Sequence, residues 1–296
     1  MKFAAIDIGS NAIRLLVTEV LENGPGVKYK KRLFVRVPIR LGEDVFLQQK
    51  ISDEKSEKLV KALSSFKSMI ELFGVRTYFA CATSAFREAE NGKKIVEKIK
   101  EQTGMKVDII DGKREAEIIY TCHVAEKLNH SKSYLYVDVG GGSTEITMFS
   151  KGKLIYSNSF PVGTVRLLYD KVSVNEWDKM KETVKEITKD HAPLPLIAIG
   201  TGGNINKLYK VLEPENKYIV YKKMKELYEE LSVMSVEERI EKFGFNEDRA
   251  DVIVPAAKIY LSVMKWADIS DIYVPKLGLA DGIVNMLYEK QTASVK

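Results

Sequence analysis

Cysteine is scarce in this sequence, with Cys81 and Cys122 as its two occurrences among 296 residues. Two cysteines provide neither a disulfide framework nor the paired spacing of a zinc site. We therefore expect both to be core residues, and a reducing, cytoplasmic location is favoured.

Long hydrophobic runs are also missing. The longest uncharged stretch, residues 192–206, contains two prolines and three glycines, whereas a transmembrane helix needs about 20 mostly apolar residues. The opening segment reaches Asp7 and Gly9 too early for the apolar stretch of a signal peptide. We therefore expect no membrane segment and no membrane partner.

Charge of one sign is in only slight excess. The chain has 46 Lys+Arg and 41 Asp+Glu, a net charge of +5. This excess permits an anionic ligand, but nucleic-acid binding prefers a concentrated basic stripe. The densest basic segment, 28–40, alternates cations with apolar residues and is interpreted as a strand with one solvated face, so no nucleic-acid partner is expected.

The chain does contain a regular series of strands and helices, and its length predicts about two domains of roughly 150 residues. Hydrophobic periodicity, caps and turn residues predict the first half: strands at 3–8, 13–20 and 27–37, a helix between Ser52 and Gly74, a strand at 75–82, a helix at 92–102, a strand at 107–110 and a helix at 114–128. The first three strands indicate an antiparallel meander, and the alternation that follows is typical of a layered α/β fold.

The same order of elements begins again near residue 134. Strands are predicted at 134–139, 144–149, 154–160 and 196–199, and helices at 165–169 and 176–190. Ile6-Asp7-Ile8-Gly9 resembles Val137-Asp138-Val139-Gly140, and the two aspartates lie 131 positions apart (138 − 7). This repetition indicates an internal duplication, with two unrelated Asp-x-Gly turns as the alternative.

The last third is mainly helical. Ser235 and Glu238 have the spacing of a capping box. One long buried helix is expected at 246–267, kinked by Pro255, followed by a strand at 271–274 and a terminal helix after Gly282.

Four glycine-rich turns follow predicted strands, at 9–11, 140–143, 200–203 and 278–282. Such turns let backbone N–H groups converge on an anion, at the strand ends where α/β folds place ligands. Together they favour a phosphate-binding cleft, although each can also be a plain tight connection. The G-x-x-x-x-G-K-[ST] and G-x-G-x-x-G motifs are absent from the sequence, which removes the main support for P-loop and Rossmann sites.

Carboxylates accompany two of these turns. Asp7 and Asp138 directly precede them, and Glu145 lies on the strand that leaves the second. Magnesium is usually held by one or two carboxylates together with phosphate oxygens and water, so these residues suit a Mg²⁺ site. For Asp7, a capping or turn role is the alternative.

Two further charged residues have no assignment from their chemistry alone. Arg87 follows a predicted strand, where its guanidinium can bind phosphate or serve as an ordinary surface charge. Glu115 stands in the first turn of a helix, where an acid favours the helix dipole. The three histidines at 123, 130 and 191 have no ligand spacing.

Seven motifs resemble, in order along the chain, those of the exopolyphosphatase and guanosine pentaphosphate phosphatase family of the actin-like ATPase superfamily. They are Asp7-Ile-Gly-Ser-Asn11 with Arg14, Ala82-Thr-Ser-Ala-Phe-Arg87-Glu-Ala89, Gly112-Lys-Arg-Glu115-Ala116, Asp138-Val-Gly-Gly-Gly-Ser-Thr-Glu145, Pro161-Val-Gly-Thr-Val-Arg166, Gly200-Thr-Gly-Gly-Asn204 and Arg249-Ala-Asp251. The resemblance implies two actin-like (ribonuclease H-like) α/β domains with a phosphate-binding cleft between them. We expect domains at 1–124 and 125–296, with the option that the terminal helix, about 283–296, packs back on the first.

The resemblance also implies roles for individual residues. Glu115 corresponds to the base that activates the attacking water, and Asp138 and Glu145 to acids that position Mg²⁺, or alternatively Mn²⁺, and water; Asp7 is a third candidate metal ligand. The implied phosphate-binding positions are Ser10, Asn11, Arg87, Gly141, Gly142, Ser143, Gly202 and Gly203. The implied reaction is in-line attack of water on a terminal phosphoryl group.

Three positions depart from the family pattern. Arg114 replaces the first glutamate of Glu-Glu-Ala, Ala12 replaces a serine, and Ala280 stands where an arginine is usual. From the resemblance, we also expect the chain to lack the extra helical C-terminal domains of long family members. We expect an exopolyphosphatase, with guanosine pentaphosphate as the alternative substrate, and with a superfamily kinase or a non-catalytic polyphosphate or alarmone sensor as other classes. A homodimer is compatible with the sequence.

Overall fold

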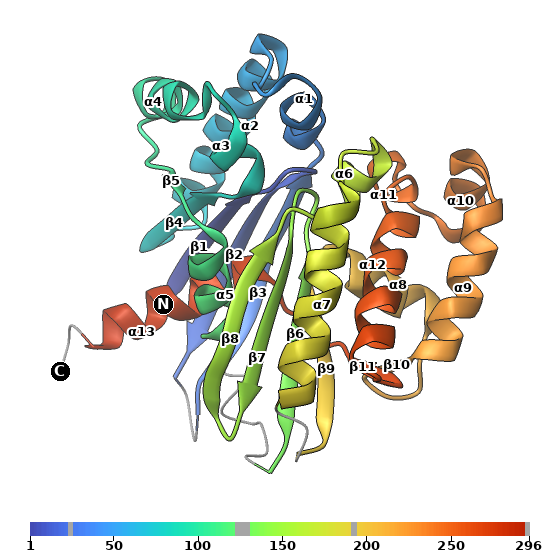
Figure 1. The fold of residues 1–296 in the computed structure, drawn as a ribbon. Helices are drawn as coiled ribbons and strands as arrows, with labels where there is room; N and C mark the ends of the chain where they lie inside the picture. Colours follow the sequence, from blue (N-terminus) through green and yellow to red (C-terminus); the bar gives the residue numbers. More distant parts are fainter. Residues whose placement is uncertain (23–25, 122–130, 191–193, 294–296) are drawn as a thin grey trace. The chain divides into compact units, whose positions relative to one another are not determined.

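The computed structural model describes residues 1–22, 26–121, 131–190 and 194–293 (Figure 1). The chain divides into two compact units. Unit 1 consists of Met1–Cys122 and Leu279–Lys296, and unit 2 of His123–Gly278. The predicted boundary at 124/125, Cys122 and the three histidines lie outside the described residues, as does the end of the helix predicted at 114–128.

Unit 1 contains a five-stranded sheet of order β3-β2-β1-β4-β5. Its strands are β1 (Lys2–Ile8), β2 (Ile13–Leu21), β3 (Lys28–Val37), β4 (Thr77–Ala82) and β5 (Asp108–Ile109). The first three pair antiparallel, which confirms the predicted meander, while β4 and β5 continue the sheet in parallel. The carboxyl ends of β1, β4 and β5 therefore point to one edge of the sheet, and the predicted Asp7 turn lies there.

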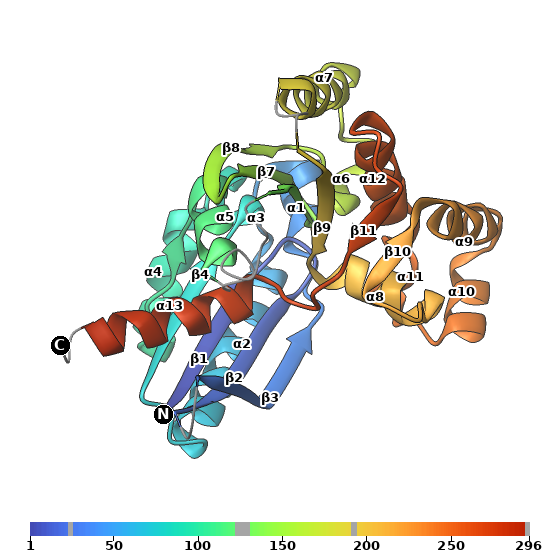
Figure 2. The same ribbon diagram turned by 90° about the horizontal axis from the view of Figure 1, so that it is seen from below.

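The helices of unit 1 are α1 (Leu41–Gln48), α2 (Asp53–Leu72), α3 (Ser84–Glu88), α4 (Gly92–Thr103), α5 (Gly112–Tyr120) and α13 (Leu279–Ala293). Ser52 caps α2, as predicted, by accepting a hydrogen bond from the Lys55 N–H at 3.3 Å. Helix α13 packs against β1, β2 and α5 (Figure 2) and supplies Ile283 and Val284 to the core of this unit.

The prediction of a glycine turn at 278–282 is wrong, because most of this segment is helical. Helix α13 already begins at Leu279, so Gly282 lies in its first turn. A Cβ at Gly282 would stand 2.2 Å from the carbonyl oxygen of Ile118 in α5. The glycine is therefore required by close packing of two helices.

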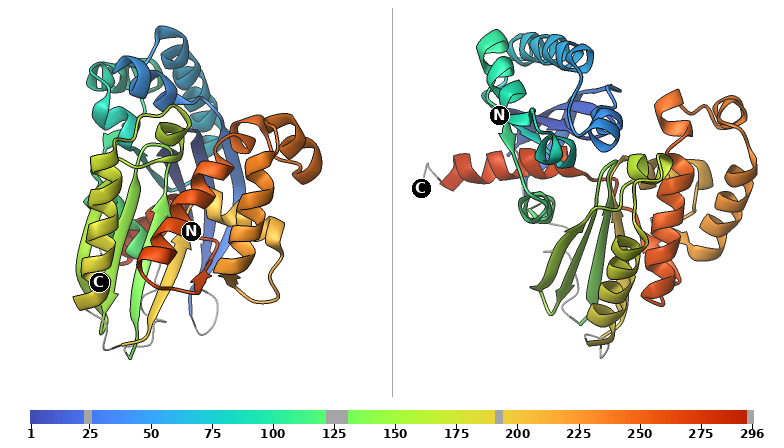
Figure 3. Two further views of the ribbon diagram at one scale, coloured as in Figure 1. Left: turned by 45° about the vertical axis from the view of Figure 1, so that its right-hand side comes forward. Right: turned by 45° about the horizontal axis from the view of Figure 1, so that its top comes forward.

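Unit 2 contains a six-stranded sheet of order β10-β11-β9-β6-β7-β8. Its strands are β6 (Ser133–Val139), β7 (Thr144–Ser150), β8 (Lys153–Phe160), β9 (Leu196–Thr201), β10 (Tyr218–Val220) and β11 (Asp271–Tyr273). Its helices are α6 (Thr164–Leu168), α7 (Val174–Asp190), α8 (Gly203–Leu212), α9 (Tyr221–Val233), α10 (Val236–Phe243), α11 (Glu247–Ala250) and α12 (Ile253–Trp266). Helix α12 lies beside α7, α8 and α9 (Figure 3). It contributes many residues to the core of this unit.

The single kinked helix predicted at 246–267 is also wrong, because the chain forms α11 and α12 with a break at Asp251 and Val252. Pro255 is the third residue of α12, where its missing N–H would have no intrahelical partner in any case. It therefore lies in the first turn of a new helix instead of bending an old one. The capping box of Ser235 and Glu238 at the start of α10 is confirmed.

The two units repeat one topology. Reading from the third strand of each meander, the order β3-β2-β1-β4-β5 in unit 1 matches β8-β7-β6-β9-β11 in unit 2, with β10 added at the far edge. The pairing of β2 with β3 shifts register after Val17, and that of β7 with β8 after Met148. In both units this shift lies ten positions after the aspartate of the first strand (17 − 7 and 148 − 138). The fold is thus the predicted duplicated α/β architecture.

Candidate functional site

A row of polar side chains crosses the whole sheet of unit 1 at the level of Asp7. Strand pairing places Asp7 opposite Arg14 on β2 and opposite Cys81 on β4. Arg14 is opposite Arg36, and Cys81 is opposite Asp108. Directly paired residues project from the same face of a sheet, so two cations, two carboxylates and a thiol share one face.

Asp7 is held by an ion pair. Its Oδ2 accepts a hydrogen bond from Nη1 of Arg14 at 2.5 Å, and the residue is buried. The guanidinium neutralises this carboxylate and occupies one of its oxygens. A divalent cation at Asp7 would therefore compete with Arg14.

The first glycine turn is fixed by contacts with α1 and α3. The Oγ atoms of Ser10 and Ser84 lie 2.8 Å apart in a buried hydrogen bond. The Ser10 carbonyl accepts from the Gly42 N–H at 2.7 Å, and the Asn11 carbonyl accepts from the Arg40 N–H at 3.0 Å. The predicted phosphate-binding turn is therefore pre-formed within unit 1.

The structure brings Arg87 and Glu115 together. Nη1 of Arg87 donates to the Ile110 carbonyl at 2.9 Å and lies 3.6 Å from Oε2 of Glu115. The Asp111 side chain caps α5 by accepting from the Arg114 N–H at 2.7 Å. Two residues from separate motifs thus form one cation–carboxylate pair near the start of α5.

Cys81 lies near both predicted carboxylates of this unit. Burial raises the pKa of its thiol well above the ordinary value, and the negative charges of Asp7 and Glu115 raise it further. A neutral thiol is a poor nucleophile, and the residue is buried as predicted.

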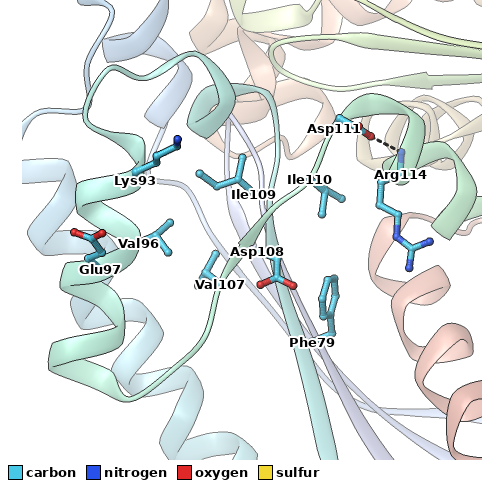
Figure 4. Close-up of a pocket in the computed structure, with 10 residues that line it drawn as sticks. All are labelled: Phe79, Lys93, Val96, Glu97, Val107, Asp108, Ile109, Ile110, Asp111 and Arg114. Atoms are coloured by element: carbon cyan, nitrogen blue, oxygen red, sulfur yellow. Dashed lines mark hydrogen bonds between the residues drawn. The ribbon is translucent and has the colours of Figure 1, made fainter.

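A pocket of about 720 Å³ opens beside the start of α5, at the β5 edge of the unit 1 sheet (Figure 4). It is lined by Phe79, Lys93, Val96, Glu97, Val107, Asp108, Ile109, Ile110, Asp111 and Arg114. None of the predicted catalytic or phosphate-binding residues is among them. Arg114, one of the departures from the family pattern, faces this pocket and donates to Glu117 at 3.1 Å.

A second polar row crosses unit 2, and here its centre consists of two carboxylates. Strand pairing places Asp138 opposite Glu145, with Thr201 beyond Asp138 and Ser159 beyond Glu145. Oε1 of Glu145 accepts from the hydroxyls of Ser143 at 2.7 Å and Ser159 at 2.8 Å. Oδ2 of Asp138 accepts from the Thr201 hydroxyl at 2.8 Å. Three hydroxyl donors thus orient two adjacent acids.

The glycine turn at 140–143 is held from one side by the first turn of α6 and by Gly163 directly before it. The carbonyls of Gly140, Gly141 and Gly142 accept hydrogen bonds from the Thr164 N–H, the Val165 N–H and the Arg166 Nε, at 3.0, 2.8 and 2.7 Å. This approach is so close that a Cβ at Gly163 would lie 2.3 Å from the Gly141 oxygen. With its carbonyls bound on this side, the turn can present N–H groups to an anion on the other.

The third glycine turn closes over Asp138. Gly202 has φ = +96°, and a Cβ there would lie 2.7 Å from Oδ1 of Asp138. Helix α8 then begins at Gly203, and Asn204 in its first turn accepts a hydrogen bond from Arg249. Glycine at 202 is therefore required both by its backbone conformation and by the neighbouring carboxylate.

Tyr260 also belongs to this site and was not singled out by the sequence. This fully buried tyrosine of α12 donates a hydrogen bond to the Thr201 carbonyl at 2.8 Å. Burial raises the pKa of its hydroxyl well above the ordinary value, and the Asp138 charge raises it further. No motif marks it, because it lies 59 positions after Thr201 in a helix that is apolar nearly all round.

Within the described ranges, no three His, Cys, Asp or Glu side chains form a group able to hold a metal ion by themselves. Asp138 and Glu145 still fit magnesium chemically, because Mg²⁺ takes one or two carboxylates and completes its shell with water and phosphate oxygens.

The described residues also include no helix both long enough and apolar enough to cross a membrane.

Comparison with known proteins supports one family. The model of the Ppx/GppA phosphatase family matches residues 35–291. The bifunctional 3-dehydroquinate synthase/phosphatase of Fusobacterium nucleatum is 27% identical over 89% of this chain. Exopolyphosphatase 1 of Mycobacterium tuberculosis is 22% identical over 96%, and the guanosine-5'-triphosphate,3'-diphosphate pyrophosphatase of Photobacterium profundum is 26% identical over 97%.

The lengths of these relatives differ. The chain spans 43% of the F. nucleatum protein and 59% of the P. profundum protein, but 87% of the mycobacterial one. Among solved structures, the Aquifex aeolicus Ppx/GppA family member has a TM-score of 0.76 and 26% identity, with 98% of both chains covered. An exopolyphosphatase from Cytophaga hutchinsonii has a TM-score of 0.84 at 23% identity, also with 98% of both chains covered, and shows the same fold.

Proposed function

Because the chain belongs to the Ppx/GppA phosphatase family, we propose that it is an exopolyphosphatase that releases the terminal phosphate of inorganic polyphosphate. The observation that carries this proposal is the pair Asp138–Glu145, oriented by three hydroxyls beside the glycine turn at 140–143. Two adjacent carboxylates next to a phosphate-binding turn suit magnesium-assisted phosphoryl chemistry.

We assign the remaining steps to residues within each unit. Asp138 and Glu145 would hold Mg²⁺, which neutralises charge on the phosphoryl oxygens when it is bound. The N–H groups of Gly141, Gly142 and Ser143 bind phosphate. In unit 1, the turn at Ser10 and Asn11 binds phosphate, and Glu115 accepts the proton of the attacking water.

Arg87 supports two roles in this proposal. Its guanidinium lies 3.6 Å from Oε2 of Glu115, where this ion pair can orient the carboxylate toward the attacking water. Its planar nitrogens can also bind phosphate oxygens. Asp7 remains a candidate metal ligand only if a phosphate chain draws Arg14 away from it.

Guanosine pentaphosphate is the second candidate substrate, because the P. profundum pyrophosphatase is 26% identical to this chain over nearly its whole length. The scissile bond is a phosphoanhydride in both cases. The same residues therefore serve both substrates, and the choice between them depends on contacts outside the reacting group.

The test is phosphate release from short polyphosphate, long polyphosphate and guanosine pentaphosphate with Mg²⁺ or Mn²⁺. We expect wild-type activity on polyphosphate, and a loss of about 10²-fold or more in kcat for Glu115→Gln. Glu117→Gln is the matched control, since it changes an exposed acid of the same helix and should keep full activity. No release from any substrate would refute the hydrolase assignment, whereas equal rates for Glu115→Gln would refute only the base.

A further inference from the structure

At the carboxyl ends of β6 and β9, the buried side chain of Thr201 links the two strands by a hydrogen bond to Asp138. Asp138 and Thr201 are paired on these strands, and the chain turns away at Gly202 directly afterwards. The Thr201 carbonyl accepts the Tyr260 hydroxyl at 2.8 Å, and the Thr201 hydroxyl donates to Oδ2 of Asp138 at 2.8 Å. A continuous path of two hydrogen bonds and one residue thus leads from α12 to the Asp138 carboxylate.

We propose that Tyr260 is a positioning residue for metal binding, which acts on the Asp138 carboxylate through Thr201. This inference rests on the proposed function, in which Asp138 holds the divalent cation. Tyr260 is fully buried and its hydroxyl is already used by Thr201, so it reaches neither metal nor substrate itself.

The geometry explains why such a device is needed at this point. Asp138 has the backbone of Gly202 on one side, so close that a Cβ there would be 2.7 Å from Oδ1, and the Thr201 hydroxyl on the other. A shift of Thr201 would rotate its hydroxyl away and release Oδ2. Because a metal-binding carboxylate depends on its hydrogen-bonded partners for orientation, the position of the Thr201 backbone sets the position of the ligand.

The described residues of unit 1 show a different arrangement at the equivalent position. There the corresponding aspartate, Asp7, is held directly by the Arg14 guanidinium, and the residue paired with it on the parallel strand is Cys81. The hydroxyl-mediated path therefore accompanies the repeat whose aspartate stands next to a second carboxylate.

The experiment measures Mn²⁺ binding to the full-length protein without substrate, from the decrease of the free-ion electron paramagnetic resonance signal. The variants are Tyr260→Phe, Thr201→Val and Thr201→Ser, with Asp138→Asn as a variant that removes the ligand. Tyr209→Phe is the matched control, because it deletes another tyrosine-to-carbonyl hydrogen bond of unit 2, to Asn216 at 3.1 Å. All measurements are made well below each variant's unfolding temperature.

We expect Tyr260→Phe and Thr201→Val each to weaken Mn²⁺ binding about tenfold, and their combination to weaken it little further, because both interrupt one path. Thr201→Ser keeps the hydroxyl and should restore affinity, and Tyr209→Phe should bind like the wild type. If Tyr260→Phe lowers only the unfolding temperature and leaves the affinity unchanged, the inference is wrong while the metal assignment stands. If the wild-type protein binds no Mn²⁺, both fail.

Discussion

Equivalent residues of the two repeats carry opposite charges. Seven positions after the aspartate at the end of the first strand, unit 1 has Arg14 (after Asp7) and unit 2 has Glu145 (after Asp138). An arginine opposite an aspartate stabilises the strand pair, whereas two carboxylates directly opposite each other repel. Unit 2 offsets this repulsion with hydroxyl donors from Ser143, Ser159 and Thr201. A bound cation would offset it further, which is the residue-scale reason to place the metal in unit 2.

A second charged residue permits a prediction about stability. Burial alone would raise the pKa of Asp44, but hydrogen bonds from the Lys55 ammonium and from Ser52 outweigh it and hold this pKa below its ordinary value. A lowered pKa means that the carboxylate stabilises the fold above its unfolded-state pKa of about 4, and that this stabilisation is lost as the pH falls through the folded-state value.

We therefore expect Asp44→Asn to lower the free energy of unfolding by about 2 kcal/mol at pH 7, with a smaller difference from the wild type as the pH falls from 5 to 3. Urea unfolding across this range is the measurement. Glu54→Gln is the control, because Glu54 pairs with Lys58 on an exposed helix face and should leave the midpoint unchanged. A difference that grows on acidification would contradict the assignment.

At the scale of elements, two glycines four positions apart differ in whether close packing requires them. A Cβ at Gly282 would stand 2.2 Å from the Ile118 carbonyl oxygen, whereas a Cβ at Gly278 would meet no atom within 4 Å. We expect Gly282→Ala to push α13 away from α5 and to destabilise the protein by about 1–3 kcal/mol, and Gly278→Ala to be nearly neutral. Thermal unfolding of both variants checks this, and equal effects would mean that the helices are not in close contact.

Elements set by local signals were predictable from the sequence. Ser52 and Ser235 mark helix starts because a hydroxyl three residues before a free N–H is sufficient. Short apolar runs bounded by turn residues predicted the strands of both sheets, and their close succession predicted the meander of unit 1. Of the two misjudged elements, Gly282 depends on a distant residue, Ile118. The start of α12 has a local reason, because Pro255 is tolerated in the first turn of a helix.

The candidate site was predictable in part for the same reason. Asp138, Glu145 and the glycine turns lie within one short segment and share a visible motif. The ion pair of Asp7 and Arg14 follows from the register of the β1–β2 hairpin, but it was not predicted from the sequence. Tyr260 could not be found, because its partner Thr201 is distant in the chain and no local pattern distinguishes its hydroxyl from any other buried tyrosine.

At the scale of the whole molecule, each unit has a large hydrophobic core among its described residues, and that of unit 1 joins residues from both ends of the sequence. The core of unit 1 combines Phe3 and Leu16 with Ile283 and Val284 of α13, whereas the core of unit 2 is made of residues within 135–274. Because compact units with cores of their own can unfold as separate cooperative units, we expect two calorimetric transitions.

Ile283→Ala and Met180→Ala test this separation, since each truncates a fully buried side chain in one core. Loss of a buried isoleucine or methionine costs about 2–5 kcal/mol, which lowers the transition of a unit of this size by several degrees. Differential scanning calorimetry should show Ile283→Ala shifting the transition that Gly282→Ala also shifts, and Met180→Ala shifting the other. A single transition lowered equally by both substitutions would show that the two cores unfold together, because the cooperative unit would then be the whole chain.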